Sequence, residues 1–529
     1  MNSSNKALYP LIGSLLVAVG IFLGIFLTDG KTSSSSSSIE GKYEQKLADI
    51  IQVLDREYVD TIDKKQLFEK TISDLLHGLD PHSNYIAAED LAAMSESIQG
   101  KFGGVGIRFT IYDDTLSVVN VIDQSPAFKV GIQKFDQIIN VDGEDIANVG
   151  LSNEHVRELL KGEEGTPVNI TILRKGEKLN KKVIRGAVPI ESISASYMLT
   201  DDIGYIRLGQ FSMQSANEFY VAAIALKGQG MKKMVFDLRY NGGGVLGSAV
   251  SILDAILEKG TPIVSTKGKN NPERIIYSES KPFLGHVDMA VLINSSSASA
   301  SEIVAGAIQD NDRGTIIGRR SFGKGLVQQD IQLKDGSNLR LTVSRYYTPT
   351  GRSIQKPYME NYEDYMMDEL NRYENGELYE LDSSLLADSL KYTTPKGKIV
   401  YGGGGIMPDI FVPLDTTGSS MYYRRLQYAN VFNEFSYHYA RFNDLTKYRN
   451  VQAFDREFKL TEKILNDFKK YAADKHDIAF NEREYQLSLE RIKTSVKAEI
   501  ARQRWLELGA YYIFNKNDNE INTAIKALQ

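Results

Sequence analysis

Cysteine is absent from all 529 residues of this chain. The chain therefore cannot contain a disulfide framework, a thiolate zinc site, a cysteine nucleophile or a lipid-anchored cysteine. Histidine occurs only six times, at 77, 82, 155, 286, 438 and 476, and never in the H-E-x-x-H spacing of a zinc hydrolase. Any hydrolytic chemistry must rely on serine, lysine, carboxylates or a metal site that the sequence does not reveal.

The chain also lacks a strong charge of one sign, since 62 Lys and Arg face 68 Asp and Glu, for a net charge of −6. This balance argues against a general polyanion binder, and we expect no nucleic-acid partner. A composition of 42% hydrophobic and 25% charged residues excludes wholesale disorder. At roughly 150 residues per domain, the length predicts three or four domains.

One long uncharged run lies near the N-terminus, at Leu8–Leu27. At about 1.5 Å per residue a helix of this length would span the hydrocarbon core of a bilayer. Lys6 precedes the run and favours a cytoplasmic N-terminus. We predict an uncleaved membrane anchor; a cleaved signal peptide is the open alternative, although no A-x-A-like site follows the run. In both cases the chain after Lys31 is expected to be exported.

Composition and hydrophobic periodicity divide the chain into six segments. They are an anchor or signal segment (1–31), a Ser-rich tether (32–42), a helical region (43–97), a β-rich unit (98–185), an α/β core (186–415) and a helical tail (416–529). An acidic, Tyr-rich insertion near 356–398 is expected at the periphery of the core. In the tail an apolar stripe predicts either internal packing or a partner-binding helix; it comprises Leu489, Ile492, Val496 and Ile500.

Two glycine-rich motifs suggest nucleotide binding but fit it poorly. Gly242, Gly244 and Gly247 match G-x-G-x-x-G between a strand and a helix, yet no first βαβ unit continues from them. The segment from Gly318 to Lys324 resembles a phosphate-binding loop until Gly325 replaces the required Ser or Thr. A strand-like alternation follows where that motif needs a helix. Neither motif therefore indicates a nucleotide site.

The chemistry is concentrated in two other segments. Asn294–Asp310 leads from an apolar strand through small hydroxyl residues into a helix. A serine at that helix N-terminus is suited to nucleophilic attack, although a simple N-cap is the alternative. Lys324 lies between glycines and apolar segments. Burial there would depress the pKa of the lysine and make it a usable base, so a Ser–Lys pair is the economical interpretation.

Seven motifs in order resemble the carboxyl-terminal processing proteases, the tail-specific Ser/Lys endopeptidases of peptidase family S41. The resemblance covers about residues 43 to 415. The motifs are L-D-P-H-S-N-Y at 79–85, F-G-G-V-G-I at 102–107, S-P-A at 125–127, D-L-R-Y-N-G-G-G at 237–244, S-A-S-A-S-E at 297–302, F-G-K-G-L-V-Q at 322–328 and G-G-G-I-M-P-D at 403–409.

The resemblance implies a role for each matching residue. It implies a nucleophile at Ser299, a general base at Lys324 and a lysine-orienting amide at Gln328. It further implies oxyanion donors at the backbone amides of Ala300, Gly244 and Gly243, and no metal, nucleotide or organic cofactor. Four nearby charged residues are expected to be structural hydrogen bonders: Glu302, Asp310, Asp237 and Arg239.

The β-rich unit resembles a PDZ domain, which binds a peptide C-terminus by strand addition. Its carboxylate-binding loop would use the amides of Gly104, Val105, Gly106 and Ile107. Two phenylalanines, Phe128 and Phe135, depart from the family pattern and are expected to enlarge the core of the domain.

The predicted fold class is multidomain α/β. It comprises an N-terminal transmembrane helix, a helical segment, a PDZ-like β-rich domain, an α/β Ser/Lys protease core and a helical C-terminal tail. The predicted function is an exported serine endopeptidase that captures free protein C-termini, anchored in the inner membrane with the protease in the periplasm. A homo-oligomer is left open. The alternatives are a catalytically silent PDZ scaffold and a Ser/Lys acyl transferase or amidase.

Overall fold

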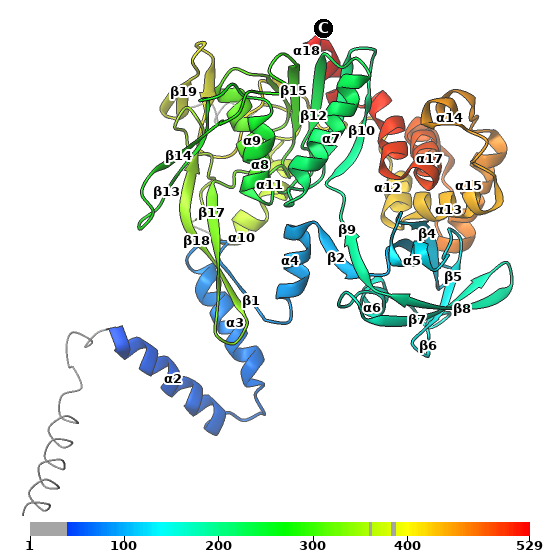
Figure 1. Cartoon of the computed structure of the whole chain (residues 1–529), viewed down its shortest axis with the longest axis horizontal. Coiled ribbons are helices and arrows are strands. Elements are labelled where there is room, and N and C mark those ends of the chain that lie inside the picture. Colours follow the sequence, from blue (N-terminus) through cyan, green and yellow to red (C-terminus); the bar gives the residue numbers. More distant parts are fainter. Residues whose placement is uncertain (1–39, 359–361, 382–387) are drawn as a thin grey trace, which may run out of the picture. The chain divides into compact units, whose positions relative to one another are not determined.

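A computed structural model describes residues 40–358, 362–381 and 388–529 (Figure 1). The chain divides into two compact units, Met1–Asp74 and Leu75–Gln529, which are described separately. In the first unit, helix α2 (Glu40–Glu57) is followed by the start of α3 (Lys64–His77). Both helices are amphipathic. Their apolar side chains, among them Leu47, Leu54 and Phe68, line a common cavity.

The prediction of an N-terminal transmembrane helix is contradicted by the structure. None of the helices in the described part of the chain is long and apolar enough to cross a membrane. Helix α2, the first of them, carries charged residues on both sides of the uncharged stretch Ile50–Leu54. The predicted segment, Leu8–Leu27, lies outside the described residues. The transmembrane helix is therefore removed from the fold class, whereas the multidomain α/β organisation fits.

A six-stranded sheet forms the centre of the α/β core, in the order β10-β11-β12-β15-β16-β21. All neighbours are parallel except β10 and β11, which are antiparallel. The strands are β10 (Ile193–Met198), β11 (Ile203–Leu208), β12 (Lys233–Asp237), β15 (Asp288–Ile293), β16 (Thr315–Gly318) and β21 (Ile410–Phe411).

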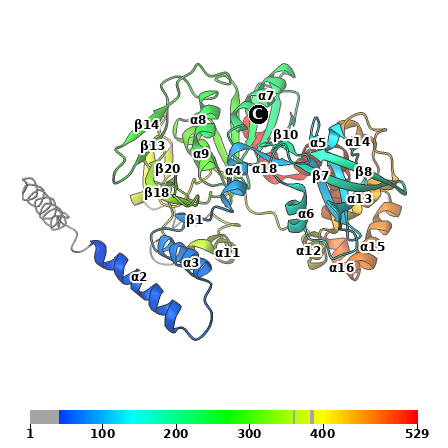
Figure 2. The same cartoon turned by 60° about the horizontal axis from the view of Figure 1, so that its bottom comes forward.

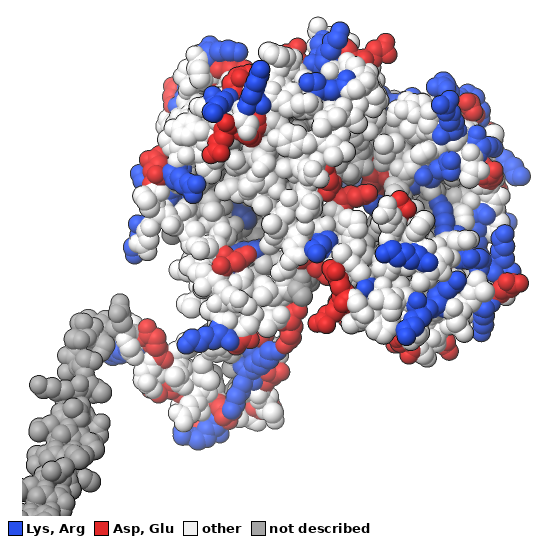
Figure 3. Space-filling view, in the orientation of Figure 1, with Lys and Arg blue, Asp and Glu red and all other residues white. Residues whose placement is uncertain are grey.

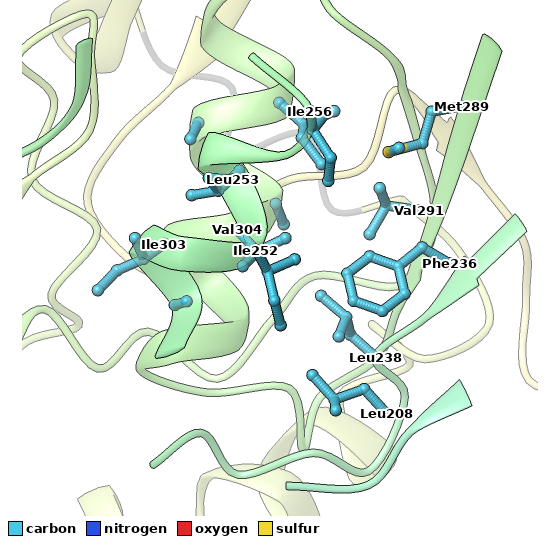
Figure 4. Packing of buried hydrophobic residues seen from close by; sticks show 14 of the residues in the cluster. Leu208, Phe236, Leu238, Ile252, Leu253, Ile256, Met289, Val291, Ile303 and Val304 are labelled. Atoms are coloured by element: carbon cyan, nitrogen blue, oxygen red, sulfur yellow. The ribbon is translucent and has the colours of Figure 1, made fainter. Parts of the chain in front are cut away.

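Three helices cover one face of this sheet: α7 (Ser215–Gly228), α8 (Leu246–Asp254) and α9 (Ala300–Asp310). Ile252 of α8 and Val304 of α9 pack against Phe236 and Val291 on the strands (Figure 4). All four side chains are fully buried. Because α9 is also buried along its whole length, its N-terminus is held firmly at the carboxyl end of β15.

A second sheet lies beside the first and contributes to the same site. Its order is β1-β18-β13-β14, with β17 paired antiparallel to β18. The strands are β1 (Asn84–Ile86), β13 (Pro262–Lys267), β14 (Arg274–Tyr277), β17 (Leu326–Gln332) and β18 (Asn338–Tyr347). Strand β17 begins directly after Gly325, so the segment that resembled a phosphate-binding loop leads into a strand and not a helix.

The β-rich unit contains a sheet in the order β3-β4-β5-β7-β8, with β6 paired to β5. Ser152 caps α6, because its hydroxyl accepts a hydrogen bond from the amide of His155. The elements are β3 (Ile107–Tyr112), β4 (Thr115–Val121), α5 (Pro126–Lys129), β5 (Gln137–Val141), β6 (Glu144–Asp145), α6 (Asn153–Leu160), β7 (Pro167–Arg174) and β8 (Glu177–Ile184). Helix α4 (Leu91–Gln99) and the pair β2 (Lys101–Gly104) and β9 (Gly186–Pro189) join this unit to the core.

The tail is helical, and its apolar stripe packs internally. Ile492, Val496 and Ile500 are fully buried in a cluster with aromatic residues of neighbouring helices. The elements are α12 (Met421–Tyr428), α13 (Val431–Phe442), α14 (Val451–Glu457), α15 (Glu462–His476), α16 (Glu482–Leu487), α17 (Leu489–Phe514), η4 (Asn515–Asn517) and α18 (Asn519–Leu528). Helices α13 to α16 lie beside the β-rich unit in both views, whereas α18 lies on the core (Figures 1 and 2).

The insertion within the core contains α10 (Tyr362–Met366), α11 (Asp368–Glu374), η3 (Asp388–Leu390), β19 (Lys391–Thr393) and β20 (Ile399–Tyr401).

On the outside of the molecule, acidic and basic side chains are interspersed over much of the face seen in Figure 3.

Candidate active site

A cavity of about 480 Å³ lies between the two sheets of the core. It is lined by Ser299, Lys324 and Gln328, the three residues that the family resemblance selects for catalysis. Its other lining residues are Ile98, Gly242, Gly243, Gly244, Val245, Leu246, Ile303, Leu326, Val327, Asp330, Arg340 and Tyr346. Residues that are distant in the sequence, from Ile98 to Tyr346, therefore meet at one cavity.

Ser299 lies where β15 gives way to α9, immediately before the first helical residue. Its φ of 54° is unusual for a residue other than glycine and indicates local strain of the kind found at functional sites. Ala300 is the first residue of α9, so its amide has no carbonyl within the helix to bond. The hydroxyl and this amide therefore lie together at the positive end of a buried helix.

Glu302 joins the backbones of the serine and lysine segments. One of its carboxylate oxygens accepts hydrogen bonds from the amides of Ser299 and Lys324, each at 2.9 Å. The other oxygen accepts from the Ser321 hydroxyl at 2.6 Å and from the Gly323 amide at 2.7 Å. The side chain is fully buried, and burial raises the pKa of the carboxyl. These contacts support a structural role for Glu302, as expected from the sequence.

Tyr346, on β18, joins the same two segments through their carbonyl groups. Its hydroxyl donates to the carbonyl oxygen of Lys324 at 2.6 Å and lies 3.2 Å from that of Ser299. The ring is 1% exposed. Glu302 and Tyr346 therefore hold both peptide units of the pair, one through amides and the other through carbonyls. Sequence reasoning missed Tyr346, because only its position in an alternating strand distinguishes it.

Lys324 lies in an environment that favours its neutral form. Burial lowers the pKa of its amine, and the guanidinium of Arg340 lowers it further. Glu302 and Asp80 act in the opposite direction. Burial, and the positive charge that Lys324 carries when protonated, lower the pKa of the neighbouring His82 imidazole to about 3. The net effect is a lysine whose pKa lies below its ordinary value.

Gln328 is held by a chain of hydrogen bonds that ends in the L-D-P-H-S motif. Its amide nitrogen donates to the hydroxyl of Thr342 at 3.2 Å, and Thr342 donates to Asp80 at 2.9 Å. Asp80 also accepts from the amides of His82 and Ser83. Thr342 and Asp80 were not identified from the sequence as site residues. The L-D-P-H-S motif was the available signal, since it belongs to the motifs that matched the family.

The three predicted oxyanion donors are not equivalent. The amide of Gly243 donates to the side-chain oxygen of Asn241 at 2.9 Å and is thus already engaged. Glycine is needed at position 243 because the backbone there passes close to Ser299. At its φ of +98°, a Cβ would lie 2.7 Å from Cβ of Ser299 and 2.9 Å from the Ala300 nitrogen. Gly244, at φ +138°, is fixed by its neighbours, because Gly243 and Val245 both pair with the backbone of Phe211.

The insertion is not peripheral, contrary to expectation. The guanidinium of Arg372 on α11 donates to the carbonyl oxygens of Arg320, Ser321 and Phe322, directly before Lys324. Glu369 on the same helix accepts from the hydroxyl of Ser295 at 2.9 Å. The acidic, Tyr-rich composition suggested a peripheral insertion, but these charged groups hydrogen-bond to the serine and lysine segments.

A second cavity, of about 350 Å³, lies between β3 and α6 of the β-rich unit. Val105, Gly106 and Ile107 line it, whereas Gly104 is absent from its lining and belongs to β2. Gly106 has φ +82°, and a Cβ there would lie 2.3 Å from Cβ of Ser125. Arg157 adds positive charge to the lining, whereas the ammonium of Lys161 pairs with Glu96. The cavity thus combines a strand edge, apolar walls and one unpaired arginine of the lining.

The two unusual phenylalanines do not enlarge the core of this unit. The side chain of Phe128 is 53% exposed. Phe135 instead packs against the tail, with its ring 5.5 Å from that of Tyr437 on α13. Its backbone has φ +71°, a conformation that explains why glycine is usual at this position. The departure therefore creates a contact between the β-rich unit and the tail.

Within residues 40–358, 362–381 and 388–529, no group of three or more His, Asp or Glu side chains is placed to hold a metal ion.

Three family models match the chain. Peptidase family S41 matches residues 202–362, and a PDZ domain matches residues 103–184. A family of unknown function, DUF8443, matches residues 422–506 in the tail. The S41 match contains both Ser299 and Lys324, and the PDZ match contains the second cavity's loop.

Curated relatives extend the similarity beyond single domains. A carboxy-terminal-processing protease of Bartonella bacilliformis is 38% identical over 356 residues, which cover 64% of this chain and 80% of that protein. The carboxy-terminal processing protease CtpB of Bacillus subtilis is 30% identical over 376 residues, 68% of this chain and 77% of that protein. A solved photosystem II D1 C-terminal processing protease is 28% identical, with a TM-score of 0.34, and covers 59% of this chain and 90% of its own. On the strength of the curated relatives, this chain belongs to the carboxy-terminal processing proteases, with an S41 peptidase domain and a PDZ domain.

Proposed function

We propose that this protease is an exported endopeptidase that binds the free C-terminus of a protein on its PDZ domain and cleaves the chain with Ser299 and Lys324. The observation that carries the proposal is the double connection between these two residues. Glu302 holds their amides and Tyr346 their carbonyls, at the edge of one cavity. The part that concerns export rests on the sequence run Leu8–Leu27 and is tested by cell fractionation.

In the proposed reaction the neutral amine of Lys324 removes the hydroxyl proton of Ser299 as the oxygen attacks the peptide carbonyl. The amides of Ala300 and Gly244 stabilise the oxyanion. Gln328, held through its amide nitrogen by Thr342, offers its carbonyl oxygen to the lysine amine. Protonated Lys324 then gives its proton to the leaving amine, and water hydrolyses the acyl-enzyme.

The PDZ cavity supports recognition of a free carboxylate. An extended peptide can pair with β3, and its terminal carboxylate can meet the amides around Gly106. Arg157 supplies a favourable charge, whereas the ammonium of Lys161 pairs with Glu96. A silent scaffold is the weaker alternative, because a binder needs neither a lysine with a lowered pKa nor the two bridging side chains. An acyl transferase or amidase would not need a peptide-binding domain.

We expect a peptide substrate with a free apolar C-terminus to be cleaved faster than the same peptide with an amidated C-terminus. Amidation removes the charge that the loop amides and Arg157 meet, so KM should rise while kcat changes little. The measurement compares steady-state cleavage of the two peptides. Equal kinetics for both would contradict carboxylate recognition.

Arg157→Glu is the matched variant for this experiment, because Arg157 is exposed and its replacement leaves the domain core intact. The variant should lose most of the preference for the free carboxylate. Arg108→Glu is the control: Arg108 is on β3, outside the cavity lining, and pairs with Glu191. If the preference for the free C-terminus survives in Arg157→Glu but is lost in Arg108→Glu, the peptide carboxylate does not bind beside Arg157.

A further inference from the structure

The last helix of the chain, α18, belongs structurally to the protease core. Its residues Ile521 and Ala524 are fully buried in a cluster with Val235 and Leu292 of the central sheet. Figure 1 shows α18 beside β12 and β15, away from helices α13 to α16 of the tail. The helix lies beyond both the S41 match and the match to the family of unknown function, which ends at residue 506.

Three arginines and three carboxylates form a cluster under this helix. They are Arg207, Arg239 and Arg319 of the core, Asp237 of the core, and Asp518 and Glu520 of the tail. Arg239 is 2.7 Å from Asp518 and also pairs with Glu520, while Arg319 is 2.8 Å from Glu520. Arg207 is 2.9 Å from Asp237. The arginines are at most 6% exposed.

The charges balance only when the tail is present. The core alone supplies three buried arginines and one carboxylate, which would leave two uncompensated positive charges. An unpaired buried charge is strongly destabilising, because it loses its hydration and gains no partner. The S41 core of this chain is therefore electrostatically incomplete without Asp518 and Glu520.

Glu520 contacts the two segments that lead to the proposed catalytic groups. Arg239 stands five positions before Gly244, and Arg319 stands five positions before Lys324. The carbonyl oxygen of Arg239 accepts a hydrogen bond from Arg207 at 3.0 Å, so the backbone of this segment is held as well as its side chain. A displacement of either arginine would be transmitted over one short loop to the cavity.

We propose that Asp518 and Glu520 are positioning residues of the protease site: through Arg239 and Arg319 they fix the oxyanion loop and the lysine segment. This inference rests on the proposed function for the roles of Gly244 and Lys324. The helical tail is thus a required part of the enzyme and not an appended module. Neither carboxylate lines the cavity that holds Ser299 and Lys324, so their loss should affect kcat more than KM.

The experiment compares Glu520→Gln and Asp518→Asn with wild type in the full chain. With a short fluorogenic peptide, we expect kcat to fall about tenfold or more in Glu520→Gln, while KM changes little. The fall should be smaller than the loss caused by removing an oxyanion donor outright. The rate at which a fluorophosphonate labels Ser299 should fall in parallel. Hydrogen exchange should accelerate in residues 239–245 and 319–325 but not across the PDZ sheet.

Glu499→Gln is the matched control, since Glu499 forms an ion pair with Arg502 at 2.8 Å within the same tail. It should retain wild-type kinetics and exchange. If Glu520→Gln unfolds, the more exposed Asp518 provides the milder variant for the same measurements. Kinetics and local exchange equal to those of Glu499→Gln would overturn the inference. Absence of wild-type cleavage and of Ser299 labelling would instead refute the proposed function.

Discussion

Lys324→Arg is expected to lower kcat by about 10²- to 10⁴-fold, the range that a general base contributes. Arginine keeps the positive charge and roughly the side-chain length of lysine. Its guanidinium stays protonated in proteins, however, and so cannot accept the proton of Ser299. Lys324→Ala should have a similar effect. Because Glu302 and Tyr346 bind only the backbone of Lys324, both variants should remain folded. Turnover near the wild-type value in Lys324→Arg would contradict a lysine base.

The pH profile of the wild-type enzyme provides an independent readout of Lys324. Its pKa is lowered by burial and by Arg340, and only the neutral amine can accept a proton. Activity should therefore rise with pH as the lysine deprotonates and level off above its pKa. Arg340→Gln removes a positive neighbour, so the pKa should rise and the rising limb should move to higher pH. A limb that moves to lower pH, or activity that falls with rising pH, would contradict this account.

Gly243→Ala should reduce kcat by about 100-fold or more, comparable to the loss of an oxyanion donor. The added methyl would lie 2.7 Å from Cβ of Ser299 and from the carbonyl oxygen of Ala298. Moving these atoms aside costs free energy, because they belong to the backbone or to buried groups. A φ of +98° is also unfavourable for alanine. The loop must therefore shift away from Ser299, and with it the amide of Gly244.

Gly247→Ala is the control for this variant. Gly247 lies four residues further along the same glycine-rich motif, on α8, with open space around its Cα. Its replacement should leave cleavage near the wild-type rate, because alanine favours a helix. Steady-state kinetics and thermal unfolding of both variants form the measurement. Equal activity in Gly243→Ala and Gly247→Ala would show that the close approach to Ser299 is not required.

Much of the fold followed from local patterns in the sequence. The alternation after Gly325 predicted a strand, and β17 begins at Leu326. The hydroxyl of Ser152 caps α6 by accepting a hydrogen bond from the amide of His155, three residues away. The cluster of small hydroxyl residues before an apolar helix drew attention to Asn294–Asp310, and the family resemblance then selected Ser299, which lies at the N-terminus of α9. Each of these features depends on residues within one turn or one strand of each other.

The partners of the site could not be predicted, because they come from distant positions. Thr342 and Asp80 are separated by 262 residues, and Glu520 lies 281 residues from Arg239. Tyr346 is one aromatic residue among 29 tyrosines, and no spacing marks it. Phe135 was interpreted as core-filling, although its left-handed backbone turns it towards the tail. Tertiary packing alone determines these contacts.

The most direct test of the Ser299–Lys324 site is cleavage of an unfolded protein with a free C-terminus, followed by mass spectrometry of the products. Wild-type enzyme and Ser299→Ala are purified in the same way and incubated with the same substrate. The proposed mechanism predicts internal cleavage by the wild-type enzyme and no cleavage by Ser299→Ala. The same fragments from both proteins would contradict Ser299 as the nucleophile.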